Sequence, residues 1–169
     1  MNIRRATIAD IPALKKLVNG AYRGEGSKKG WTTEADLLDG IRTSEAALNE
    51  MLETPNALIL AADDGKNLQG CVYLEKQTDA LYLGMLTVEP ALQGKGLGAA
   101  LMMAAEESAK SLGCKKIQMT VITVRDSLIA YYNRKGYADT GERKAFPTDP
   151  KFGIAKQPLE FMVMEKMLI

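Results

Sequence analysis

The residues with the clearest chemical potential are three glycines at alternate positions, Gly94, Gly96 and Gly98, directly before a long run of helix-forming residues. Glycine permits backbone turns with positive φ and lets a ligand approach the N–H groups closely. The start of a helix adds unpaired N–H groups and the positive end of the helix dipole. The pattern therefore predicts a phosphate-binding loop, against the simpler interpretation that the glycines only fit a strand-to-helix turn.

The spacing of these glycines disfavours two common nucleotide-binding loops. A Walker A loop needs glycine five residues before Gly94 and Ser or Thr after Lys95, but the chain has Glu89 and Gly96 at those positions. A dinucleotide fingerprint needs G-x-G-x-x-G, whereas a single residue separates each pair of glycines here. A nucleoside triphosphatase and a dinucleotide-dependent enzyme are therefore both disfavoured.

The chain of 169 residues contains no histidine, which excludes Ser-His-Asp catalysis, Cys-His catalysis and any imidazole metal ligand. Acids and bases must then be Tyr, Asp, Glu, Lys, Cys or water. The two cysteines, Cys71 and Cys114, are too few for a four-thiolate zinc site, and we expect no metal. With 22 Lys+Arg against 21 Asp+Glu the net charge is +1, which argues against a nucleic-acid partner.

Length and composition fit one compact domain spanning residues 1–169, because 46% of the residues are hydrophobic and 25% are charged. The first residues lack the apolar run of a signal peptide, and no stretch approaches the length of a membrane span. We therefore expect a cytoplasmic protein with no membrane partner.

Hydrophobic periodicity predicts the elements that position the glycine loop. Helices are predicted from a cap at Thr7 or Asp10 to about residue 21, from a cap at Thr32 or Thr33 to about 52, and at 99–112 and 126–135. Strands are predicted at 2–7, 57–62, 70–76, 81–88, 116–122 and 159–168. The strand-loop-helix-strand unit around the glycines indicates a mixed α/β fold with a parallel crossover.

The run from Leu86 to Gly98, Leu-Thr-Val-Glu-Pro-Ala-Leu-Gln-Gly-Lys-Gly-Leu-Gly, resembles the acetyl-coenzyme A loop of the Gcn5-related N-acetyltransferases. That family places an apolar strand and a proline before Gln/Arg-x-x-Gly-x-Gly/Ala and a long helix. Its members usually end a later short helix in Tyr-x-x-x-Gly-Phe/Tyr, which matches Tyr132 to Tyr137 here. The resemblance covers residues 1 to about 141 in element order.

This resemblance implies a fold and a co-substrate. The implied α/β fold has a mixed, mostly antiparallel sheet of six to seven strands, with the fourth and fifth parallel, flanked by about four helices. The co-substrate would be acetyl-CoA. The residues implied to bind it are Leu86, Thr87, Val88, Gln93, Gly94, Lys95, Gly96, Leu97, Gly98 and Arg125. Arg125 stands where the family often has asparagine, seven residues before Tyr132.

The resemblance further implies direct transfer of the acetyl group to an amine in a ternary complex. A backbone N–H within residues 86–88 is the expected donor to the thioester carbonyl. Tyr132 is the expected acid for the departing thiolate, because a phenol pKa of about 10 lies above a thiol pKa of about 8.5. Its rival Tyr131 points about 100° away on a helix and does not occupy the family position.

The group that receives the amine proton is less defined by the sequence. Glu34 ranks first because the loop after the first helix usually walls the acceptor pocket in the family, and Glu25 and Glu160 are the other candidates. Trp31 and Tyr22 are candidates for the same wall. Each carboxylate also has the simpler interpretation of a solvated surface group.

The expected function is therefore an acetyl-CoA-dependent N-acetyltransferase that acts on a primary amine of a small molecule or an amino-acid-like acceptor. Two alternatives stay open. One is a protein or peptide N-acetyltransferase, which differs only in its acceptor groove. The other is an acyl-CoA-binding sensor without turnover, suggested by the lack of a clear base. A homodimer is a further option, because many relatives pair through their late strands.

Overall fold

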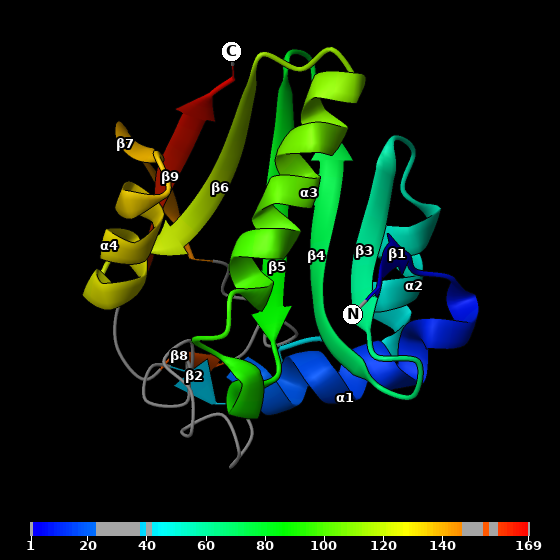
Figure 1. Ribbon diagram of the computed structural model, residues 1–169. Helices are drawn as coiled ribbons and strands as arrows, with labels where there is room; N and C mark the ends of the chain where they lie inside the picture. The colour runs from blue at the N-terminus through cyan, green and yellow to red at the C-terminus, as the bar shows by residue number, and fades with distance from the viewer. Residues whose placement is uncertain (1, 23–37, 40–41, 147–153, 156–158, 169) are drawn as a thin grey trace.

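The computed structural model describes residues 2–22, 38–39, 42–146, 154–155 and 159–168. Within them, a mixed sheet has the strand order β1-β3-β4-β5-β6-β9-β7 (Figure 1). Its strands are β1 (Asn2–Arg5), β3 (Ala57–Asp63), β4 (Leu68–Lys76), β5 (Ala80–Val88), β6 (Lys116–Ile122), β7 (Ala138–Ala145) and β9 (Glu160–Met167). A separate short pair joins β2 (Leu38–Asp39) to β8 (Ile154–Ala155).

Helices cover both faces of this sheet. They are α1 (Ile11–Tyr22), α2 (Glu45–Glu53), α3 (Leu97–Ser111) and α4 (Asp126–Arg134). Alternate residues of the central strands face opposite sides, as a strand geometry requires. Val72 and Leu74 pack with α3 residues in one core cluster, whereas Cys71 and Tyr73 pack with α1 residues in the other. In Figure 1, α3 lies in front of β4 and β5. The central strands are therefore apolar on both faces.

The parallel pair is β5 with β6, the fourth and fifth strands of the sheet in chain order, and every other pair in the sheet is antiparallel. Helix α3 makes the crossover between them. This confirms the predicted mixed sheet with its parallel fourth and fifth strands. Their pairing is short, because it runs only from Ala80 opposite Lys116 to Tyr82 opposite Gln118. Both strands continue beyond this point, so the sheet opens between them.

The second helix departs from the sequence prediction. In the described residues it begins at Glu45, where the Ser44 hydroxyl accepts the N–H of Ala47 at 3.1 Å and caps it. Leu38–Asp39, predicted as helix, forms the strand β2 instead. The predicted caps Thr32 and Thr33 lie outside the described residues.

The first helix is anchored through Asp10. Its carboxylate accepts the backbone N–H of Thr7 at 2.8 Å and both terminal nitrogens of Arg4 at 2.9 Å. Arg4 also donates to Asp63 on β3 at 2.7 Å. The predicted cap at this end of the helix is thus combined with an ion-pair network that ties β1 to β3.

Three further features concern the cysteines, possible metal ligands and possible membrane-spanning helices. Both thiols, Cys71 and Cys114, are free and buried. In the part of the chain that the structure describes, no three metal-ligating side chains come together. No described helix is both long enough and apolar enough to cross a bilayer.

Candidate active site

The glycine loop turns through two left-handed residues before α3. Gly94 has φ of +83° and Gly96 has φ of +85°. A side chain in this region costs roughly 1–2 kcal/mol, so these two glycines have a conformational reason to be there. Gly98 differs, because it already belongs to α3. A Cβ placed on Gly98 would lie 3.5 Å from Tyr131 Oη and 3.7 Å from Val88 Cγ2.

Among the described residues, no side chain caps the start of α3. Gly96 occupies the N-cap position without a side chain, and the first turn carries no acidic residue. The first N–H of α3 that donates to a carbonyl one turn earlier is that of Ala100, which donates to Gly96 at 3.0 Å. The N–H groups of residues 97–99 come before it and have no such carbonyl to bind. This is the local arrangement that favours an anion at a helix N-terminus.

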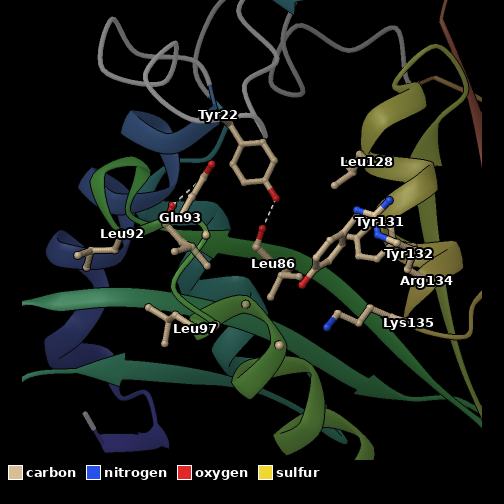
Figure 2. A pocket seen from close by; sticks show the side chains of 15 residues that line it. Tyr22, Leu86, Leu92, Gln93, Leu97, Leu128, Tyr131, Tyr132, Arg134 and Lys135 are labelled. Atoms are coloured by element: carbon tan, nitrogen blue, oxygen red, sulfur yellow. Dashed lines mark hydrogen bonds between the residues drawn. The ribbon is translucent and has the colours of Figure 1, made fainter.

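A cavity of about 380 Å³ lies between this loop, β5 and α4 (Figure 2). It contains most of the sequence-predicted site residues. Those lining it are Leu86, Val88, Gln93, Gly94, Gly96, Leu97, Gly98 and Tyr132. The structure thus brings the glycine loop and the predicted acid to the same cavity, although some 40 positions separate them in the sequence.

Other predicted residues lie elsewhere. Thr87 is 2% exposed, and its hydroxyl donates to the Met85 carbonyl at 2.9 Å. Lys95 is exposed and does not line the cavity, and Arg125 lines a neighbouring cavity instead. Glu160 is exposed and lines neither cavity. The remaining candidates, Glu25, Trp31 and Glu34, lie outside the described residues.

The end of β5 is irregular where it meets the cavity. Cys71 pairs with Thr87 and Tyr73 with Gly84, so β5 has one residue more than β4 over this stretch. Such a bulge re-aims the backbone and its side chains. Met85 accordingly takes a φ of +52°, which is rare for a residue with a side chain. The bulge therefore reverses which residues of β5 point to each face of the sheet just before the glycine loop.

Tyr22, at the end of α1, is held against this irregular stretch. Its hydroxyl donates to the carbonyl of Leu86, as the dashed line in Figure 2 marks. Tyr22 lines both cavities. It was expected only as part of an acceptor wall, and its contact with the strand adds a role in fixing the bulge.

A second cavity of about 320 Å³ lies where β5 and β6 diverge. Residues of both strands line it, together with Arg42, Arg125, Phe146 and Phe161. It meets the first cavity at four shared residues, Tyr22, Leu86, Leu128 and Tyr132. Two ligands in these cavities would face each other at this junction.

Tyr132 has the environment of a neutral phenol. It is 6% exposed and makes edge contacts with the rings of Tyr131, at 5.5 Å between centroids, and Tyr137, at 6.1 Å. Burial, and then the neighbouring hydroxyl of Tyr22, raise the pKa of Tyr132 above that of a free phenol, against a smaller opposing effect of Arg125. Tyr132 therefore keeps its proton at neutral pH and can donate it at the junction.

The first cavity also contains two cations that the motif did not identify. Arg134 and Lys135 line it from the end of α4, at 6.0 and 5.5 Å from the centre of the Tyr131 ring. Figure 2 shows both on the α4 side, across from Leu97. No carboxylate is among the described residues lining this cavity. Two cations and an uncapped helix start suit a ligand that carries several phosphate charges.

Comparison with known proteins gives three kinds of match: a curated sequence, solved structures and a protein family. One curated sequence, the uncharacterized protein YdhI of Bacillus subtilis (strain 168), is 26% identical over 77 residues, covering 46% of this chain and 47% of that protein. The matched stretch thus spans about half the length of this curated relative. Many solved structures share the fold over essentially the whole chain, among them the two described next.

The first solved structure is smu.2055 from Streptococcus mutans UA159, with a TM-score of 0.75 and 17% identity, covering 100% of both chains. The second is yncA from Salmonella typhimurium, solved with its cofactor acetyl-CoA. Its TM-score is 0.71 and its identity 18%, covering 100% of this chain and 94% of that one. At these identities the structures establish the fold.

The decisive match is to a family. The model of the Acetyltransferase (GNAT) family, whose co-substrate is acetyl-CoA, matches residues 15–137, well over half of the chain. The matched stretch includes the bulged strand β5, the glycine loop, the uncapped start of α3 and Tyr132. The chain therefore belongs to the GNAT acetyltransferase family.

Proposed function

We propose that this protein transfers the acetyl group of acetyl-CoA to a primary amine of a small molecule or amino-acid-like acceptor, by direct attack in a ternary complex. The observation that carries the proposal is the uncapped start of α3, which faces a cavity shared with the buried phenol of Tyr132. Residues 1–169 would form one catalytic domain.

The co-substrate would lie in the first cavity. Its pyrophosphate would accept hydrogen bonds from the N–H groups at 97–99, with Arg134 and Lys135 nearby to balance the charge. The acyl-bearing arm would extend along the bulged end of β5 toward Leu86, and a strand edge can hold such an arm by backbone hydrogen bonds. Bound acetyl-CoA supplies an activated acyl carbon and a thiolate leaving group.

The reaction would take place at the junction of the two cavities. The amine nitrogen forms a bond to the acyl carbon, the carbon–sulfur bond breaks, and the sulfur takes the proton of Tyr132. The amine gives up its surplus proton to solvent, and Tyr132 is reprotonated from solvent. A buried phenol suits this role because its raised pKa keeps the proton in place until negative charge develops on sulfur.

The experiment is thiol release from acetyl-CoA with a panel of amines, comparing the wild type with Tyr132→Phe. We expect the variant to lose about 100-fold in kcat, within the usual range for one acid–base group, with its binding of acetyl-CoA kept. Tyr137→Phe is the matched control, because it removes a buried hydroxyl next to the same ring and lines neither cavity.

Three results would contradict the proposal. Equal rates for the wild type and Tyr132→Phe would exclude Tyr132 as the acid. Tight binding of acetyl-CoA with no turnover on any acceptor would favour the sensor. Turnover of peptides alone would favour the protein or peptide acetyltransferase.

A further inference from the structure

The described lining of the second cavity is unevenly charged. It includes Arg42 and Arg125, and it includes no Asp or Glu. Inside a partly enclosed cavity the field of such groups is focused rather than screened. A ligand whose only charge is positive would be repelled there, and an anionic group would be attracted.

Arg42 is held in place by its surroundings. The side chain of Asn19 on α1 accepts the backbone N–H groups of Arg42 at 2.7 Å and Thr43 at 2.9 Å, and it donates to the Thr43 carbonyl at 3.0 Å. The guanidinium lies 5.5 Å from the centre of the Tyr22 ring, and that ring is itself bonded to β5. The charge of Arg42 is thus positioned beside the junction where the amine must sit.

Arg125 lines the same cavity. It precedes α4, its backbone N–H donates to the Ile122 carbonyl at 3.0 Å, and the residue is 9% exposed. The rest of the described cavity lining is largely apolar and aromatic. Phe146 and Phe161 lie there with 5.2 Å between ring centres.

We infer that the acceptor is an α-amino acid, or a close analogue, with an apolar side chain, whose carboxylate pairs with Arg42. This rests on the proposed transferase function and names its substrate class. Planar guanidinium groups suit a carboxylate because they can donate two parallel hydrogen bonds. The apolar side chain would pack against Phe146 and Phe161, and the α-amine would then point to the junction with the first cavity.

This arrangement also bears on how the amine becomes a nucleophile. A carboxylate bound to arginine stabilises a neighbouring ammonium less than a free carboxylate does. The acceptor would therefore bind with a larger neutral fraction than it has in water. The described part of the cavity achieves this without a carboxylate base.

The test uses matched compounds: L-phenylalanine and L-methionine, the amides of both, and the amines that lack the carboxyl group. Thiol release gives kcat/KM, and calorimetry gives binding both to the free chain and to the chain saturated with coenzyme A. We expect each acid to exceed its amide and its amine at least 30-fold in kcat/KM. Arg42→Gln should remove at least 10-fold of the acid's value, through KM, and leave the amine within twofold.

Two further variants separate charge from folding. Arg42→Lys should recover part of the loss, because it keeps the charge without the planar fork. Arg5→Gln, on the edge strand β1, should change nothing. The inference is overturned if amides or plain amines match the acids, if Arg42→Gln lowers all compounds equally, or if no acid binds at millimolar concentration.

The same measurements keep the two proposals apart. An acid that binds, depends on Arg42 and is not acetylated supports a carboxylate site at Arg42 and contradicts the transferase. Amines that are acetylated as well as acids support the transferase and contradict the inference. A chain that binds no acetyl-CoA contradicts the transferase, and acid binding to the free chain then decides the inference.

Discussion

Two tyrosines five residues apart show how environment decides what the same side chain can do. Tyr132 and Tyr137 are both buried, in edge contact with each other, and burial raises the pKa of each. The hydroxyl of Tyr137 has no hydrogen-bond partner in the described structure. Tyr132 instead lines both cavities. Only Tyr132 is placed to donate a proton to a ligand.

The raised pKa of Tyr132 predicts the pH dependence of acetyl transfer. The acid acts in its protonated form, which persists beyond the ordinary phenol pKa of about 10 because burial opposes ionisation. We expect kcat/KM to rise with pH as the amine deprotonates and to show no decline from Tyr132 up to about pH 9.5. The measurement is the pH profile of the wild type beside Tyr132→Phe. A declining limb below pH 9 that is present only in the wild type would contradict it.

At single positions, the sequence predicts which residues belong to the site better than it predicts where their side chains lie. The family resemblance implies that Thr87 and Lys95 bind acetyl-CoA, but it cannot show that the Thr87 hydroxyl bonds to the Met85 carbonyl or that Lys95 is exposed. Arg134 and Lys135 fall on unspecified positions of the Tyr-x-x-x-Gly pattern. A cation in the last turn of a helix also complements the helix dipole, so Arg134 gave no signal of a ligand.

Among the elements, the loop and first turn of α3 allow ligand contact to be separated from folding. Gly94 and Gly96 need positive φ, so substitutions there strain the backbone as well. Gly98 does not, and a methyl group at Gly98 would make ordinary contacts at 3.5 and 3.7 Å. Substitution of Gly98 can therefore show the effect of a side chain on ligand binding without adding backbone strain.

We expect Gly98→Ala to keep acetyl-CoA affinity within about threefold and Gly98→Leu to lose at least about tenfold, or 1.4 kcal/mol. The larger side chain would enter the space where the phosphates must approach α3. Both variants should fold as stably as the wild type or better, because glycine costs a helix about 0.5–1 kcal/mol relative to alanine. Calorimetric titration and urea unfolding check the two parts, and equal affinities for both variants would refute the phosphate assignment.

The network at the start of α1 predicts a pH-dependent stability. The hydrogen bond from Arg4, then that from Thr7, outweigh partial burial and lower the pKa of Asp10 from 3.8 to about 2. Because the folded-state pKa is depressed, this stabilisation is complete above about pH 4 and is lost as the pH falls through 2. We expect Asp10→Asn to cost about 1 kcal/mol at pH 7, because it removes the charge that pairs with the partly exposed Arg4.

Urea unfolding at a series of pH values measures this difference. The stabilities of the wild type and Asp10→Asn should converge between pH 4 and pH 2. The exposed Asp79 provides the control, because Asp79→Asn should follow the wild type throughout. A difference that stays constant with pH would show that the carboxylate charge is not the cause.

The accuracy of the predicted elements follows the strength of their burial pattern. Strands such as β4 and β5 are apolar and buried, and both were identified within one or two residues. All eight residues of β7 are exposed, so they carry no alternation that a sequence can reveal, and this strand was missed. Strand β2 has two residues, too short for any periodicity. Edge and short strands are defined by their partners rather than by their own residues.

For the whole molecule, the important feature is that β5 and β6 pair over three positions and then separate. The lost backbone pairing leaves room for both cavities to meet. A ligand arm that pairs with the free part of β5 would replace some of these hydrogen bonds, so it would bind the folded chain and not the unfolded one. Binding should then stabilise the fold.

We expect acetyl-CoA at 100 times its Kd to add about 2.7 kcal/mol to the free energy of unfolding. For a domain of this size, this corresponds to an increase in Tm of about 5–10 °C. Thermal unfolding with and without the co-substrate measures it. Gly98→Leu at the same concentration should show a much smaller increase, and equal increases would mean that binding occurs away from α3.

The two buried thiols have a practical consequence. Burial raises the pKa of Cys71 to about 12, which leaves about one part in ten thousand as thiolate at pH 8. Cys114 is buried as well. A colorimetric disulfide reagent added to follow coenzyme release would find almost no background from the native protein. Once the chain unfolds, the same reagent would react with both cysteines. The amount of protein thiol that reacts would therefore measure the fraction of enzyme that has unfolded during the assay.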